Sequence, residues 1–229
     1  MAKKKPEAAA VQEAKTTAQK ELVRIPPPNI GTASFSIRGV APLVMHKFSA
    51  KAKRKMMETQ ERGSQKAKGT KREARDFDGE WQDAIHRDED GFAGIPASAF
   101  RAAAISACRL AGFKMTVAKL SLFVCADGFD REDGMPLVRI TKGKPSRVDS
   151  TVRLESGVCS VVARPMWAPG WEAKVRVRYD ADQFSLSDVA NLLHRVGSQV
   201  GILEGRPDSR QSAGMGWGLF ELAGDVAAD

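Results

Sequence analysis

Clustered basic residues are the side chains of this sequence best suited to chemistry, and that chemistry is phosphate binding. Between residues 47 and 75 the chain carries eleven lysines and arginines against three glutamates, an excess equal to the net charge of +8 for all 229 residues. A second basic set alternates with apolar residues between 171 and 180. Binding of such cations to phosphates releases counterions, so both sets predict a nucleic-acid surface; a solvated loop is the alternative for the first. The predicted contacts are Lys47, Lys51, Lys53, Arg54, Lys55, Lys66, Lys68, Lys71, Arg72, Lys174, Arg176 and Arg178.

A glycine-rich stretch near the end of the chain, residues 204–222, is the second candidate. Gly214, Gly216 and Gly218 follow a G-x-G-x-G pattern, and neither a Lys-Ser/Thr pair nor a helix pattern follows them. Phosphate loops of nucleotide-binding proteins need that context, so nucleotide binding is not expected. Two interpretations stay open: a tight turn that needs glycine, or a surface on which a polynucleotide backbone lies beside Arg206 and Arg210. Trp217 would be buried in the first case and exposed in the second.

A histidine beside the basic run raises the possibility of catalysis. His46 could act as acid or base in metal-independent RNA cleavage, but the chain has only three histidines and one tyrosine to complete such a site. The three cysteines show no C-x-x-C pattern and the histidines no H-x-x-x-H pattern, so no metal or cofactor is expected. We therefore predict a non-enzymatic protein, with an endoribonuclease that uses His46 as the alternative.

The elements that would position these residues follow from the pattern of apolar positions. We expect a flexible tail over 1–31, a strand over 32–40, a basic inserted lobe over 47–91 with a helix over 49–62, and a flexible tail over 223–229. The rest of one domain comprises a helix over 98–112 with Ser98 as its N-cap, strands over 119–127 and 136–142, a pair formed by 157–167 and 171–180, a helix over 185–197 and a last strand over 217–222. Trp167 and Trp171, around the turn of that pair, would either cap the core or offer a stacking surface.

This order predicts an α+β fold, specifically a ferredoxin-like β-α-β-β-α-β antiparallel sheet with a basic helical insertion after the first strand. The N-terminus lacks the apolar segment of a signal peptide, and no run of about eighteen apolar residues occurs in the sequence. We expect a cytoplasmic protein that has no membrane partner.

Three of these segments together resemble a family. "SIRGVAPLVMHKF", "GIPASAFRAAAISA" and "GILEGRPDSRQSAGMGWGLFEL" are similar to segments of the RAMP superfamily of CRISPR-associated proteins, in particular its RNA-coating backbone subunits. The resemblance implies RNA contacts at the helix start, here Ser98 and Arg101, a glycine-rich loop at Gly214, Gly216 and Gly218, and an inserted lobe over residues 51–75. The chain is shorter than most such subunits.

The sequence is also similar to proteins of tailed bacteriophages, which implies a phage context. From the resemblance and the charge we expect a protein that coats single-stranded DNA or RNA as a homo-oligomer along the strand. A structural or host-interaction protein, whose basic lobe binds an acidic partner, is the third alternative.

Overall fold

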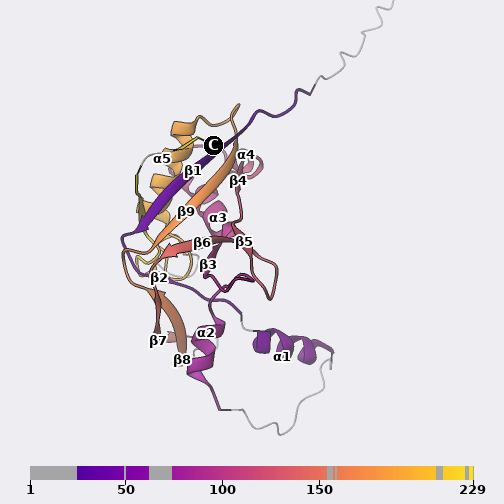
Figure 1. Cartoon of the computed structure of the whole chain (residues 1–229), viewed down its shortest axis with the longest axis vertical. Coiled ribbons are helices and arrows are strands. Elements are labelled where there is room, and N and C mark those ends of the chain that lie inside the picture. The colour runs from indigo at the N-terminus through magenta and orange to yellow at the C-terminus, as the bar shows by residue number, and fades with distance from the viewer. Residues whose placement is uncertain are drawn as a thin grey trace, which may run out of the picture.

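Two antiparallel sheets and the helices packed on them form the molecule, which is known from a computed structural model (Figure 1). The structure describes residues 25–48, 50–61, 74–153, 157, 159–209, 214–224 and 227–228. The α+β class predicted from the sequence is confirmed. No helix in these ranges is both long enough and apolar enough to cross a bilayer.

The larger sheet is built on two long strands, β1 (Ile30–Gly39) and β9 (Glu172–Asp180), which pair from one end to the other. Its other strands are β3 (Gly94–Pro96), β4 (Leu122–Val124), β5 (Gly128–Phe129), β6 (Pro136–Lys142), β10 (Phe220–Leu222) and β11 (Ala227–Ala228). The order is β10-β1-β9-β6-β3, and β11 pairs with β1, β4 with β9, and β5 with β6. Part of the predicted C-terminal tail is therefore a strand, β11, while residues 1–24 of the predicted N-terminal tail lie outside the described residues.

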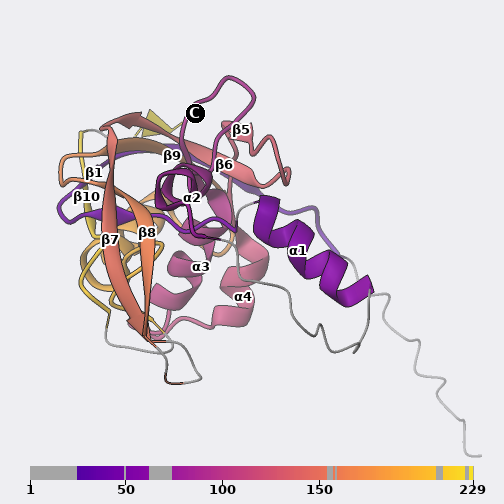
Figure 2. The same ribbon diagram turned by 90° about the horizontal axis from the view of Figure 1, so that it is seen from below.

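The core lies between one face of this sheet and the helices α3 (Ala97–Ala107) and α5 (Leu186–Arg195). Phe35 and Ile37 of β1 and Val175 and Val177 of β9 are buried on that face, as the alternation of apolar residues predicted. Figure 2 shows α3 and the shorter α4 (Met115–Ser121) on one side of β1, β9 and β6. The opposite face of β9 carries exposed basic residues.

A smaller sheet has the order β2-β8-β7 and consists of β2 (Leu43–Val44), β7 (Pro145–Arg153) and β8 (Cys159–Trp167). Helix α2 (Phe77–Asp83) lies against β8. Helix α1 (Ala50–Glu61) stands apart from both sheets in the two ribbon views (Figures 1 and 2). The predicted helix over 49–62 corresponds to α1, which the structure shows over 50–61, away from the core of the sheets.

The expected pairing of residues 157–167 with 171–180 was wrong. The first stretch is β8, which pairs with β7 and β2, whereas β9 pairs with β1, β4 and β6. Trp167 and Trp171, on either side of the turn between β8 and β9, are both buried, so they belong to the core. The Gly170 N–H donates to the Gly39 carbonyl (2.8 Å) and the Gly39 N–H donates to the Trp171 carbonyl (2.7 Å). These bonds tie the turn to the end of β1 and direct β9 into the larger sheet.

Two further predictions were wrong at element boundaries. The expected strand over 119–127 is helical up to Ser121, because Ala118 and Ser121 share one buried helix face while Leu120 is 79% exposed. Ser98 is not an N-cap: α3 begins at Ala97, directly after β3, and Pro96 holds the cap position without a side-chain hydrogen bond. By contrast, the helix predicted over 185–197 corresponds to α5, and Ser185 and Asp188 form a capping box at its start.

The C-terminal turn

Gly214, Gly216 and Gly218 all adopt positive φ angles (72°, 73° and 69°), which L residues rarely adopt. A Cβ at Gly214 would meet the Arg206 carbonyl, and one at Gly218 would meet the Ile202 carbonyl. The missing side chains of these two glycines therefore make room for the protein's own backbone. The structure thus favours the tight-turn interpretation of the glycine-rich stretch.

Two side chains around this turn were also predicted to contact nucleic acid. Arg206 is half-buried, and its Nη1 donates to the Leu203 carbonyl (2.9 Å). Arg210 lies outside the described residues. Trp217 is half-buried and packs over Gly205, where a Cβ would meet its ring. The turn is therefore largely closed by internal contacts.

Candidate functional site

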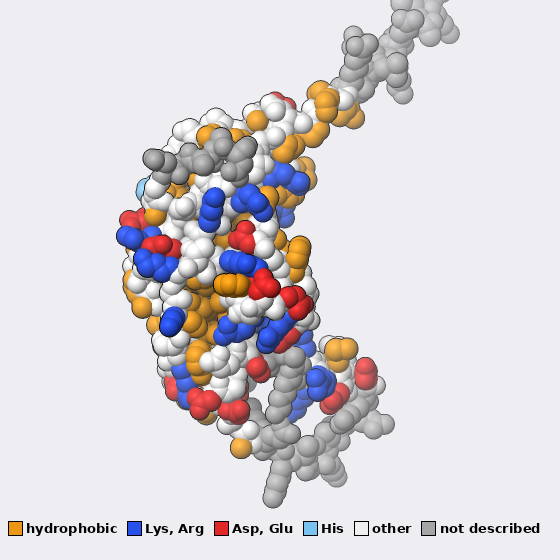
Figure 3. Space-filling model, viewed as in Figure 1, with side chains coloured by type: hydrophobic (Ala, Val, Ile, Leu, Met, Phe, Trp, Pro, Cys, Tyr) orange, Lys and Arg blue, Asp and Glu red, His pale blue; other side chains and the backbone are white. Residues whose placement is uncertain are grey.

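The exposed face of β9 brings together three predicted contacts. Lys174, Arg176 and Arg178 alternate with buried residues and point away from the helices. None of the three forms an ion pair with a described acidic residue. In Figure 3, which has the same view as Figure 1, lysine and arginine side chains gather over β1 and β9. This surface, defined by Lys174, Arg176 and Arg178, is called the β9 face below.

Two more basic residues, from the neighbouring strands β1 and β6, lie beside the β9 face and outnumber the one acidic residue there. Arg38 of β1 lies opposite Glu172, and its Nη2 is 3.2 Å from the Glu172 Oε1. The Lys142 Nζ is 2.9 Å from the same oxygen. Hydrogen bonds from Lys142 and then Arg38 lower the pKa of Glu172, so this carboxylate stays ionised and is balanced by two cations. Arg38 and Lys142 were missed by the sequence analysis, since their shared partner is distant in the chain.

Two predicted contacts from the start of α3 differ in their environments. Ser98 is exposed. Arg101 is half-buried and donates to the backbone carbonyls of Leu122 and Lys119. Its guanidinium also lies 4.9 Å from the centroid of the Phe123 ring. Arg101 is therefore held at the edge of the larger sheet, while Ser98 has no described contact with the β9 face.

The described part of the basic run after residue 47, on α1, stands apart from the β9 face. Lys53, Arg54 and Lys55 are exposed on α1, and the Lys53 Nζ lies 3.3 Å from Asp133. The backbone of Lys51 belongs to α1, but its side chain lies outside the description. Lys66, Lys68, Lys71 and Arg72 fall outside the described residues altogether. The run therefore contributes a separate basic helix.

Lys47, the first residue of the run, is the clearest correction to the predicted site. It is 5% exposed, and its Nζ lies 2.8 Å from both Asp130 Oδ1 and Glu132 Oε2. Burial opposes its charge, but the hydrogen bonds to these carboxylates outweigh burial and raise its pKa. An ammonium group enclosed in this way is not open to a phosphate, which is the contact predicted for Lys47.

Asp130 links Lys47 to a second buried residue, His86. The His86 Nδ1 lies 2.8 Å from Asp130 Oδ2. Burial alone would raise the pKa of Asp130, but hydrogen bonds from Lys47, the Glu132 backbone and His86 bring it down to about 2. Asp130 is therefore a carboxylate that carries its charge inside the protein, and its partners come from three segments of the chain.

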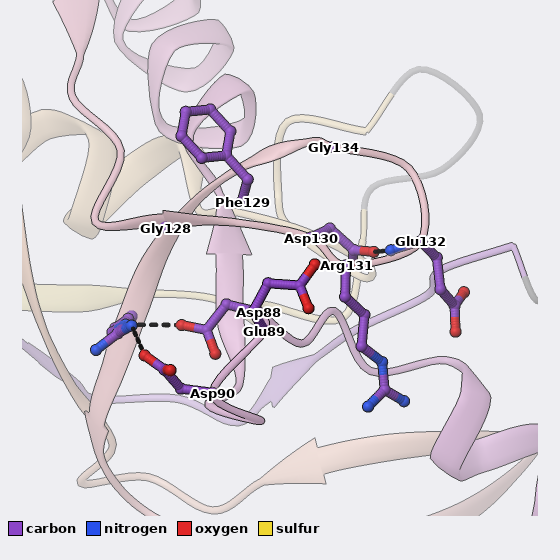
Figure 4. A pocket seen from close by; sticks show the side chains of 10 residues that line it. Asp88, Glu89, Asp90, Gly128, Phe129, Asp130, Arg131, Glu132 and Gly134 are labelled. Atoms are coloured by element: carbon purple, nitrogen blue, oxygen red, sulfur yellow. Dashed lines mark hydrogen bonds and ion pairs between the residues drawn. The ribbon is translucent and has the colours of Figure 1, made fainter.

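A cavity of about 400 Å³ opens beside this buried cluster (Figure 4). The Arg139 guanidinium lies 2.7 Å from both Asp88 and Asp90, and Phe129, which is 61% exposed, lines the cavity as well. His86, Asp130 and Asp133 bring metal-ligand atoms within 4.8 Å of one another. The Asp130 Oδ1 accepts a hydrogen bond from Lys47, and its Oδ2 is bonded to His86. The described contacts therefore already balance the charge of Asp130 by pairing within the protein.

The candidate catalytic residue, His46, lies just after β2 and therefore at the smaller sheet. Its side chain is exposed, and its ring centroid is 5.4 Å from that of Phe48. Partial removal of water and then the positive charge of Arg164 lower its pKa. His46 is therefore neutral at physiological pH and able to accept a proton. The residues of the β9 face belong to the other sheet, so the structure does not bring the two groups into one described site.

Comparison of the sequence with protein-family models and with curated proteins finds no match.

Proposed function

We propose that this protein binds single-stranded nucleic acid on the β9 face and catalyses no reaction there. The observation that carries the proposal is the row formed by Lys174, Arg176 and Arg178, three exposed cations on one rigid strand, none of them paired with a described carboxylate. Alternate residues of a strand are about 6.7 Å apart, so an extended polynucleotide can follow the row with successive phosphates.

The ferredoxin-like arrangement predicted from the order of the elements belongs to the same proposal. The order β10-β1-β9-β6, with α3 and α5 on one side of the sheet, supports it. In such a sheet the face away from the helices is open to a ligand. We further propose that residues 47–91 are a basic insertion into this core and that copies of the protein assemble head to tail along the strand, as would suit a phage protein that coats single strands.

The test is a fluorescence-anisotropy titration of labelled single-stranded DNA, single-stranded RNA and duplex at several salt concentrations. We expect the single strands to bind, with an affinity that falls steeply as salt rises. The variant Lys174→Glu/Arg176→Glu/Arg178→Glu should lose most of this binding. The matched control replaces three exposed basic residues on other segments with Glu: Lys114, Arg131 and Lys144. Equal losses in the two triple variants, or no binding by the wild type at low salt, would overturn the proposal.

An endoribonuclease that uses His46 is the second candidate, because this histidine is exposed and its pKa is lowered. Labelled RNA incubated in EDTA with the wild type and with His46→Ala separates the two functions. A binder releases no products in either reaction, whereas a metal-independent nuclease releases products only with the wild type. The third candidate, binding of an acidic protein partner, predicts weak nucleic-acid binding that does not depend on strand length.

A further inference from the structure

Phe123 is an aromatic residue on the same side of the sheet as the β9 face. It is the middle residue of β4, where Leu122 is buried and Val124 packs against the core. Side chains of a strand alternate between its two faces, so Phe123 points to the side opposite these two neighbours. It lies directly opposite Arg178 in the pairing of β4 with β9, which places the half-buried ring beside the row of cations.

Two guanidinium groups lie over this ring. The Arg178 group is 5.1 Å and the Arg101 group 4.9 Å from the ring centroid. Arg101 comes from α3 and is fixed by hydrogen bonds to the carbonyls of Leu122 and Lys119. Arg178 comes from the opposite strand and forms no ion pair with a described residue. The ring and its flanking cations are thus positioned by three different elements before any ligand binds.

This arrangement combines the two features that bind an unpaired nucleotide. Aromatic rings and guanidinium planes stack on nucleobases, and the same cations attract the phosphates on either side of a stacked base. Phe123 is the outward-facing residue of its strand and is only half-buried, so it remains partly open to solvent beside the two guanidinium groups. A duplex keeps its bases stacked inside the helix, so this feature would act only on unpaired bases.

We propose that Phe123, with Arg101 and Arg178, forms a subsite for one unpaired nucleobase of the strand bound on the β9 face. The inference rests on the proposed function and adds to it: the cations hold the backbone, and the Phe123 subsite holds a base. Contacts to phosphate alone do not distinguish a strand with bases from one without them. The Phe123 subsite does, and it also favours single strands over duplex.

The experiment compares a labelled oligothymidylate with an abasic strand of the same length and charge, using the full chain and one salt concentration. The wild type should bind the thymidine strand more tightly, by about 5- to 150-fold if one base stacks. Phe123→Leu keeps an apolar side chain and should bind the two strands equally, whereas Phe123→Tyr keeps the ring and should retain the preference. Circular dichroism checks that both variants are folded.

The outcomes separate the subsite from the function. A preference for the thymidine strand that persists in Phe123→Leu overturns the subsite and leaves the binding function standing. Binding of both strands with equal affinity by the wild type does the same. If the wild type binds neither strand, the proposed function and the subsite are both wrong. Loss of the preference in Phe123→Leu together with its retention in Phe123→Tyr supports the subsite.

Discussion

The buried cluster of Lys47, Asp130 and His86 should make the free energy of unfolding fall at low pH. The substitution Asp130→Asn should remove this contribution. Asp130 has a pKa of about 2 in the folded protein against an ordinary value of 3.8. Because the folded value is the lower one, the stabilisation is present above pH 4 and is lost as pH falls toward 2. A difference of nearly two pKa units corresponds to about 2 kcal/mol of the free energy of unfolding.

The variant Asp130→Asn removes the charge and keeps the shape of the side chain. At pH 7 it leaves Lys47 with Glu132 as its remaining carboxylate partner in the cluster, and breaking a buried ion pair in this way costs about 3 kcal/mol. The wild type and the variant should differ less in their free energy of unfolding at pH 2 than at pH 7, by about 2 kcal/mol. The reason is that the wild type loses the contribution of the Asp130 charge over that range.

Urea unfolding followed by tryptophan fluorescence measures both quantities, since Trp167 and Trp171 are buried in the fold and exposed when it unfolds. Asp83→Asn, which changes an exposed carboxylate on α2, is the matched control and should have little effect at any pH. A difference between the wild type and Asp130→Asn that stays constant from pH 7 to pH 2 would refute the reasoning, as would a difference below about 1 kcal/mol at pH 7.

Three further predictions concern the start of α5, the glycine turn and the basic residues of α1. Ser185→Ala removes the capping box of α5 and should lower the free energy of unfolding by about 1 kcal/mol in urea titrations, whereas Ser187→Ala in the same turn should be neutral. Gly216→Ala should lower the free energy of unfolding by about 1 kcal/mol because of its positive φ. Gly218→Ala should lower it clearly more, because a Cβ at Gly218 meets the Ile202 backbone while one at Gly216 meets nothing; equal losses would contradict this. Reversal of Lys53, Arg54 and Lys55 to Glu should weaken binding to all sequences alike and reduce the slope of log affinity against log salt by about 2, and unchanged affinity at low salt would remove α1 from the binding surface.

Two patterns that need only neighbouring residues predicted the structure correctly. The alternation in residues 171–180 predicted both the buried side of β9 and its three exposed cations, because a strand places every second side chain on the same face. The start of α5 is likewise fixed by a local contact, the capping box that Ser185 and Asp188 form within four residues. In both cases the physical cause lies inside the segment that was inspected.

Contacts between distant segments were not predictable in this way. Lys47 looks like the first member of a basic run, and only the fold brings Asp130 and Glu132 to it across more than eighty residues. The partner of β8 was also missed, since alternation defines a strand but not its neighbour. Phe123 shows the same limit: an aromatic residue in a strand is common, and its meaning depends on Arg101 and Arg178, which come from other elements.

The division of the positive charge between two surfaces has a consequence for how a strand would be captured. Lys53, Arg54 and Lys55 lie on a helix that stands apart from the sheets, while Lys174, Arg176 and Arg178 lie on the rigid central strand of the larger sheet. Charges that do not touch the bound ligand closely act mainly on the rate of encounter, and close contacts such as base stacking act mainly on the rate of dissociation. If both surfaces act on one strand, α1 would therefore raise the association rate, and the β9 face with Phe123 would slow release.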